Sequence, residues 1–171
     1  MNLKIEKAKK EDISEIVNIY LEFIKTHKNL KEFWLPDLKI KKLKRYNELL
    51  KLKKIKIWLY KTLLKEIKRK DEFHFVGKIN KKVVGYINFC IKKNDDWYKI
   101  KKYGFIYDIC ILKKYRKKRI MKKLVKHAES ELKKRKIDYI LLNTIITNKI
   151  ATLAWEKLNY KKEAYLHIKK I

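Results

Sequence analysis

The sequence predicts an α/β protein in which helices flank both faces of one mixed sheet. Hydrophobic residues make up 46% of the 171 residues, and they fall into short runs with either strand or helix periodicity. The runs follow the order β-α-α-β-β-β-α-β-α-β, with an antiparallel meander in the middle. The sequence contains no internal repeat and no linker, so we expect a single domain over residues 1–171.

The first part of the chain predicts a strand, a helix and a basic insert. Residues 3–8 alternate like a short strand, and residues 9–27 carry apolar side chains on one helical face. After Pro36, two lysine-rich segments at 39–52 and 55–70 have apolar residues at helical spacing. We therefore expect residues 25–70 to form a basic helical insert.

The remainder of the chain predicts strands, two further helices and a final strand. Strand patterns at 73–79 and 83–93 are joined by a short hairpin connection in which Asn80 can supply a positive φ. The nearly all-apolar run at 103–112 is typical of a strand buried on both faces. The later predicted elements are a helix from Ile120 to about Lys136, a buried strand at 138–146, a helix at 148–158 and a strand at 164–171.

Charge and cysteine content limit the possible functions. Lys and Arg number 48 against 19 Asp and Glu, a formal charge of +29. Such a charge attracts nucleic acid, anionic membranes or acidic substrates, although lysines spread over the whole chain also fit a general compositional bias. Cys90 and Cys110 lie in strand-like runs without a CxxC or a histidine cluster, so we expect reduced core thiols and no metal site.

No leader-like or membrane-spanning segment is visible in the sequence. No apolar run follows Met1, and none approaches the roughly 20 residues that cross a bilayer. We therefore expect a cytoplasmic protein.

The densest positive charge lies where the apolar run at 103–112 meets the helix that begins at Ile120. Arg116, Lys117, Lys118 and Arg119 stand at the helix N-terminus, where the macrodipole disfavours cations by about 0.3–1 kcal/mol each. A bound polyanion would reverse that penalty, because a helix N-terminus offers unpaired N–H groups to phosphate. The residues form either a phosphate site or one part of a lysine-rich surface.

Two motifs resemble signatures of the GCN5-related N-acetyltransferase (GNAT) family, and the resemblance covers nearly the whole chain. In that family a strand with the motif V-x-P-x-[YF] runs into a loop with the motif [QR]-x-x-G-x-[GA]. Residues 111–115 stand at the positions of the strand motif, and residues 116–121 stand at those of the loop motif but lack its glycines. A second family signature begins with N-x-x-A, which residues 148–151 resemble. It ends with [YFW]-E-K-x-G-[FY], which residues 155–160 resemble. Asn159 replaces the glycine of the second motif, a change that a left-handed helix cap tolerates.

The resemblance implies a fold and an activity. The fold is that of acyl-CoA N-acyltransferases, with a mostly antiparallel mixed sheet. The activity is transfer of an acetyl group from acetyl-coenzyme A to a primary amine of a protein, peptide or small molecule, directly in a ternary complex and without a metal. The residues implied in binding acetyl-coenzyme A are Ile109, Cys110, Ile111, Arg116, Lys117, Lys118, Arg119, Ile120, Met121, Asn148 and Trp155. Asn148 could equally act as an ordinary helix N-cap.

The sequence leaves the catalytic acid and base unassigned. Trp155 stands where many family members carry a tyrosine that protonates the leaving thiolate, and an indole N–H cannot do so near neutral pH. The segment LLNTIIT lacks the glutamate that some relatives use as a base. Asp108 is the nearest acid in sequence, but we expect it to be a structural partner of the surrounding lysines.

The partners follow from charge and from the missing motif residues. The basic insert would cover the acceptor side and favour an acidic or an RNA-bound acceptor. The short C-terminal part leaves a sheet edge that a homodimer would cover. The absent glycines, tyrosine and glutamate support an alternative, a catalytically degenerate protein of this fold whose basic surface binds RNA or a ribosomal partner.

Overall fold

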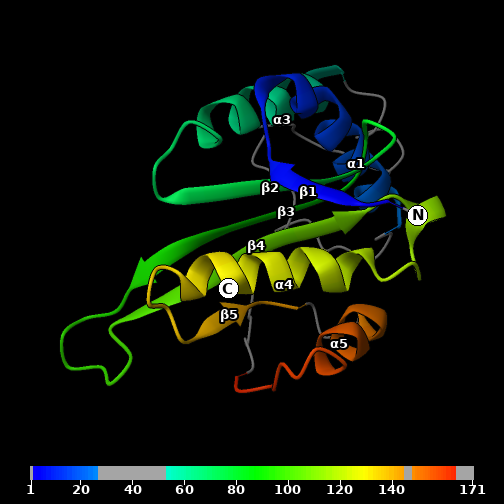
Figure 1. The fold of residues 1–171 in the computed structure, drawn as a ribbon. Helices are drawn as coiled ribbons and strands as arrows, with labels where there is room; N and C mark the ends of the chain where they lie inside the picture. The colour runs from blue at the N-terminus through cyan, green and yellow to red at the C-terminus, as the bar shows by residue number, and fades with distance from the viewer. Residues whose placement is uncertain (1, 27–52, 145–147, 165–171) are drawn as a thin grey trace, which may run out of the picture. The chain divides into compact units, whose positions relative to one another are not determined.

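The computed structural model describes residues 2–26, 53–144 and 148–164 (Figure 1). Its contacts define two compact units, Met1–Leu141 and Leu142–Ile171, and each is described by itself. The elements of the first unit are β1 (Lys4–Lys7), α1 (Ile13–Thr26), α3 (Lys53–Glu66), β2 (Glu72–Ile79), β3 (Lys82–Lys93), β4 (Lys102–Ile111) and α4 (Ile120–Lys133), with β5 (Ile140–Leu142) at its end. The second unit contains α5 (Lys149–Glu156).

The sheet has five strands in the order β1-β2-β3-β4-β5, and the first four pair antiparallel in succession. Helix α1 contacts β3, β4 and α3 on one face, whereas α4 contacts β2, β3 and β4 from the other (Figure 1). This arrangement confirms the predicted mixed sheet with helices on both faces.

The face toward α1 carries the larger part of the apolar core. Ile13, Ile16 and Val17 of α1 are fully buried, because a spacing of three and four residues places them on one side of the helix. They pack with Ile55, Leu59 and Leu63 of α3, which recur every four residues, and with Val76 and Val83 of the sheet. Helix α3 thus confirms the second helix predicted in the insert.

The glycines of the chain allow α4 to lie close to the sheet. A Cβ atom on Gly85 would lie 2.7 Å from Cδ1 of Ile111 and 3.2 Å from Cγ2 of Ile120. One on Gly104 would lie 2.4 Å from Cδ1 of Leu132. Glycine therefore fixes the approach of the helix to β3 and β4, and with it the position of the helix N-terminus at the end of β4.

The β2–β3 hairpin and the cysteines agree with the sequence predictions. Asn80 has a φ of 49° and Lys81 a φ of 64°, which is the left-handed pair that a two-residue hairpin turn requires. Cys90 and Cys110 are buried and unpaired.

Two strand predictions were wrong in their burial. Strand β4 is not buried on both faces, since Tyr107 is 47% exposed where a bulge shifts the pairing with β3. The described part of the segment predicted at 138–146, residues 138–144, contains only the short strand β5, and Leu141 is 45% exposed. Apolar composition alone does not decide burial, because much of a protein surface is apolar.

Two further elements cannot be compared with their predictions. The predicted helix at 39–52 and nearly all of the predicted strand at 164–171 lie outside the described residues. Among the helices that are described, none combines the length and the apolar character needed to traverse a bilayer.

Candidate active site

The loop between β4 and α4 combines a 3-10 turn with two residues in the left-handed conformation. A 3-10 turn at Lys113–Tyr115 follows β4, and Arg119 is the N-cap of α4. Lys117 and Arg119 have φ values of 61° and 59°, in the left-handed region. A residue other than glycine pays about 1–3 kcal/mol for such a conformation. Arg119 stands where the family motif has its first glycine, so the loop keeps a glycine-like conformation without a glycine.

The end of this loop and the start of α4 contain a run of backbone N–H groups without a backbone acceptor among the described residues. From Lys117 to Lys122 they donate to no backbone acceptor in the described residues, and no side chain caps α4. Successive N–H groups around left-handed residues form a concave anion-binding nest, and the helix dipole adds partial positive charge. The first turn of α4 holds no acidic residue that would fill the site.

The side chains of the loop add uncompensated positive charge. The Arg116 guanidinium donates through Nε to the carbonyl oxygen of Ile111 at 3.1 Å, which ties the loop to the end of β4. The Lys118 ammonium lies 5.3 Å from the centre of the Tyr115 ring. None of Arg116 to Arg119 forms an ion pair with a carboxylate in the part of the chain that the structure describes. The unpaired N–H groups and free cations fit the pyrophosphate of coenzyme A.

The sequence-predicted residues fall into two groups. Ile109, Cys110 and Ile111 end β4 and lead directly into the loop at 116–121, so the structure brings these nine residues together within the first unit. Asn148 and Trp155 belong to the second unit. The N-cap role of Asn148 is confirmed, because its Oδ1 accepts from the Ala151 N–H at 3.1 Å. Trp155 is buried against Tyr160, with the ring centres 5.0 Å apart.

Asp108 has a different partner from the one expected. Its Oδ2 accepts a hydrogen bond from the Tyr20 hydroxyl at 2.7 Å, and no lysine pairs with it among the described residues. The expectation was wrong because Asp108 points toward α1 rather than toward the basic surface. Burial raises the pKa of Asp108, and the hydrogen bond from Tyr20 lowers it in part.

A row of polar side chains crosses the sheet on the α1 face. The strand register places His74 opposite Asn88, and Asn88 opposite Asp108. Asn88 is 6% exposed, and its Oδ1 has no hydrogen-bond partner within the described ranges. A buried carbonyl oxygen without a partner is costly, so this atom is available to a bound donor.

Two tyrosines connect the ends of this row. The Tyr86 hydroxyl lies 2.6 Å from Nδ1 of His74, and the ring of Tyr86 packs against that of Tyr20 with the ring centres 5.6 Å apart. The Tyr20 hydroxyl in turn donates to Asp108. Burial raises the pKa of both tyrosines well above the usual value, so both hydroxyls stay protonated. We call Asp108, Tyr20, Tyr86 and His74 the polar chain.

The sequence reasoning missed the polar chain. Its signal was present as single polar residues inside apolar strands, His74 in FHFV and Asp108 in YDIC. A buried polar group needs a hydrogen-bond partner, so each should have been treated as part of a network. Which residues meet depends on strand register, and the bulge in β4 hid that register.

The chain belongs to the acetyltransferase (GNAT) family, whose sequence pattern matches residues 40–160. Among proteins with curated descriptions, none matches the sequence.

Solved structures share the fold at low sequence identity. A tetramutant of a Bacillus halodurans protein superposes with a TM-score of 0.78 and 13% identity, covering 98% of this chain and 99% of that one. The PaiA N-acetyltransferase of Thermoplasma acidophilum, in complex with coenzyme A, superposes with a TM-score of 0.72 and 20% identity, covering 95% of this chain and 92% of that one. A predicted acetyltransferase of Clostridium acetobutylicum with acetyl-coenzyme A superposes with a TM-score of 0.70 and 15% identity, covering 98% of this chain and 96% of that one.

Proposed function

We propose that this protein transfers the acetyl group of acetyl-coenzyme A to a primary amine. The loop at 116–121 carries the proposal, because an arginine at a glycine position adopts the left-handed conformation and leaves a run of N–H groups unpaired. A loop that served only as a basic surface would have no need to retain this strained backbone. Family membership and the solved structures that contain coenzyme A or acetyl-coenzyme A support the same cosubstrate.

In this proposal, the residues around the loop bind and orient the cosubstrate. Acetyl-coenzyme A would supply the acetyl group as a thioester. The N–H groups from Lys117 to Lys122 would hold its pyrophosphate, and the four basic side chains would neutralise the phosphate charge. The backbone at the end of β4, Ile109 to Ile111, would donate an N–H to the thioester oxygen as negative charge develops there.

Asp108 is the proposed proton acceptor. The reaction forms a C–N bond, breaks the C–S bond and releases one amine proton, and a lysine-type amine is neutral in roughly one molecule per few thousand at pH 7. Burial raises the pKa of the Asp108 carboxyl, and a raised pKa improves a carboxylate as a base. The unpartnered Oδ1 of Asn88 lies opposite Asp108 in the sheet and would accept a second hydrogen bond from the amine.

The proposed acceptor is a primary amine that also carries acidic groups. The net charge of +29 attracts anionic molecules, and a simple polycation would be repelled. The released thiolate would take a proton from solvent, because Trp155 cannot supply one.

The test measures release of coenzyme A thiol with a panel of primary amines, acidic peptides among them. The Asp108→Asn variant keeps the shape and the acceptor oxygen for Tyr20, so we expect unchanged acetyl-coenzyme A affinity and a kcat about 10²–10⁴-fold lower. Asp138→Asn, which changes an exposed acid, is the matched control. Absence of thiol release with every amine, together with RNA binding that weakens steeply with salt, would overturn the proposal in favour of the degenerate RNA-binding protein.

A further inference from the structure

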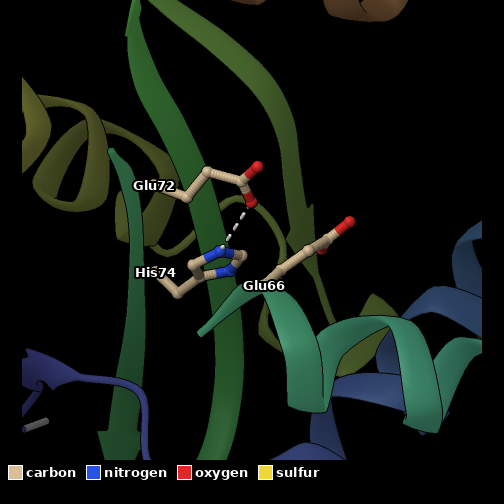
Figure 2. A group of neighbouring side chains, drawn as sticks. All are labelled: Glu66, Glu72 and His74. Atoms are coloured by element: carbon tan, nitrogen blue, oxygen red, sulfur yellow. Dashed lines mark hydrogen bonds and ion pairs between the residues drawn. The ribbon is translucent and has the colours of Figure 1, made fainter. Parts of the chain in front are cut away.

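Three ligand-type side chains converge where α3 ends and β2 begins (Figure 2). Glu66 is in the last turn of α3, and Glu72 and His74 are on β2. Each offers one atom, and these atoms all lie within 4.8 Å of one another. His74 is 2% exposed, and both glutamates are half-buried, so the cluster lies at the margin of the core and remains open to solvent on one side.

The spacing of the atoms fits a common ion better than a direct bond. Nε2 of His74 and Oε2 of Glu72 are 3.4 Å apart, which is long for a hydrogen bond. Two ligand atoms that are each about 2.1 Å from a tetrahedral zinc ion lie about 3.4 Å from each other. Glu66 is at the end of α3 with its ligand atom within 4.8 Å of the other two, so a rotation of its side chain would be needed to bring the carboxylate to the same distance.

The polar chain orients His74 for this role. The Tyr20 hydroxyl donates to Asp108, and the Tyr86 hydroxyl lies 2.6 Å from Nδ1 of His74. We assign the ring proton of His74 to Nδ1, from which it is donated to the Tyr86 oxygen. In that arrangement the lone pair of Nε2 faces the two glutamates. Histidine ligands commonly donate their other N–H to a carboxylate or to a group that leads to one, and this fixes the tautomer.

The local charge also favours a cation. Arg69 pairs with Oε1 of Glu72 at 3.0 Å through Nη1, which leaves Oε2 facing His74. Two carboxylates and one guanidinium give the cluster a net negative charge within a strongly basic protein.

We propose that Glu66, Glu72 and His74 form a binding site for a divalent transition-metal ion, Zn²⁺ in the first instance. One imidazole nitrogen with two carboxylate oxygens is a ligand set that suits Zn²⁺, and three protein ligands leave a position for water. The ion would join the end of α3 to the sheet. No metal site was predicted from the sequence, because this set shows neither a cysteine motif nor regular histidine spacing and depends on the contact between a helix end and a strand.

The test starts from protein treated with a chelator and then freed of it. Calorimetric titration with Zn²⁺ should give one site, and Co²⁺ should give visible absorption bands of a low-coordinate nitrogen and oxygen site. Glu66→Gln and Glu72→Gln should each weaken Zn²⁺ binding by about tenfold or more. Glu163→Gln, at an exposed glutamate, is the matched control and should bind as the wild type does.

Arg69→Gln provides a test in the opposite direction. Removing the guanidinium frees Oε1 of Glu72 and removes a competing cation, so the affinity for Zn²⁺ should rise. A cluster with a purely structural role would show no such gain. Equal binding by Glu66→Gln and wild type, or no cobalt absorption in folded protein, would overturn the metal site. Both readouts are independent of acetyl transfer, so this result and the test of the enzyme activity are separable.

Discussion

The two faces of the sheet are built on different principles. On the α4 face, glycines and fully buried aliphatic side chains bring the helix close to β3 and β4. On the α1 face, the same sheet carries His74, Asn88 and Asp108 beneath an apolar layer. Close packing on the first face positions a helix N-terminus, and buried hydrogen bonds on the second orient ionisable groups. Under the proposed function, the first face would position the cosubstrate site and the second would hold the proton acceptor.

The largest effect should come from the packed face. Leu124 is completely buried between α4 and the glycines of β2 and β3, so Leu124→Ala should lower the free energy of unfolding by about 2–5 kcal/mol. Leu141→Ala, at a half-exposed position, should cost much less. Urea denaturation measures both. Equal losses would mean that α4 is not closely packed on the sheet.

A smaller loss should follow when the polar chain is broken. Tyr86→Phe removes the hydroxyl that contacts Nδ1 of His74 and leaves that buried nitrogen without its partner. We expect a loss of about 1–3 kcal/mol in the same assay. Tyr139→Phe, which alters an exposed tyrosine, should be neutral. If the two variants unfolded alike, the polar chain would contribute nothing to stability.

At the rim of the α1 face, an ion-pair cluster should give the protein an acid-sensitive component of stability. The Lys78 ammonium lies 2.7 Å from carboxylate oxygens of both Glu6 and Asp12. Hydrogen bonds from Lys78 and Lys4 lower the pKa of Glu6 from 4.5 to about 2. A lowered folded-state pKa stabilises the fold above pH 4.5, and this stabilisation is lost as the pH falls toward 2.

The Lys78→Met variant tests this acid sensitivity. Its thermal unfolding should depend less on pH between 4.5 and 2 than that of the wild type. Lys4→Met, at an exposed lysine, should change the slope less. An unchanged slope in Lys78→Met would contradict the assignment.

The smallest effect should be a gain in stability at the loop. Arg119→Gly removes the cost of a left-handed arginine and should stabilise the fold by about 1 kcal/mol or less, while removing one charge from the site. Lys118→Gly is the control, because Lys118 is not among the positive-φ residues and gains nothing from glycine. Destabilisation by Arg119→Gly would show that the guanidinium, rather than the backbone, determines the loop.

Periodicity in the sequence predicted the packed face better than the polar one. The spacing of Ile120, Leu124 and Leu132 correctly gave α4 and its buried side, and Asn80 gave the hairpin turn. These features are local, so a short window of residues contains the information. The loop at 116–121 was singled out from sequence as a candidate site, because charge at a helix N-terminus is a local anomaly, and its binding role stays a prediction.

The polar face could not be derived in the same way. The partner of Asp108 is Tyr20, which is 88 residues away in sequence, and its choice depends on helix packing and on the bulge in β4. Likewise, Glu66 meets His74 only because α3 ends beside β2. Single-sequence patterns carry no such long-range information, and this is why lysines were expected around Asp108.

The measurement that tests the central claim most directly is a calorimetric titration with acetyl-coenzyme A at moderate salt, with ATP as a polyanion control. It compares the wild type with Lys118→Glu in the loop and Lys126→Glu, the same charge reversal at an exposed position further along α4. The account predicts wild-type binding in preference to ATP, a loss of about tenfold or more in Lys118→Glu, and a small change in Lys126→Glu. Equal affinity for ATP, or equal losses in the two variants, would contradict the claim that the loop between β4 and α4 is a cosubstrate site.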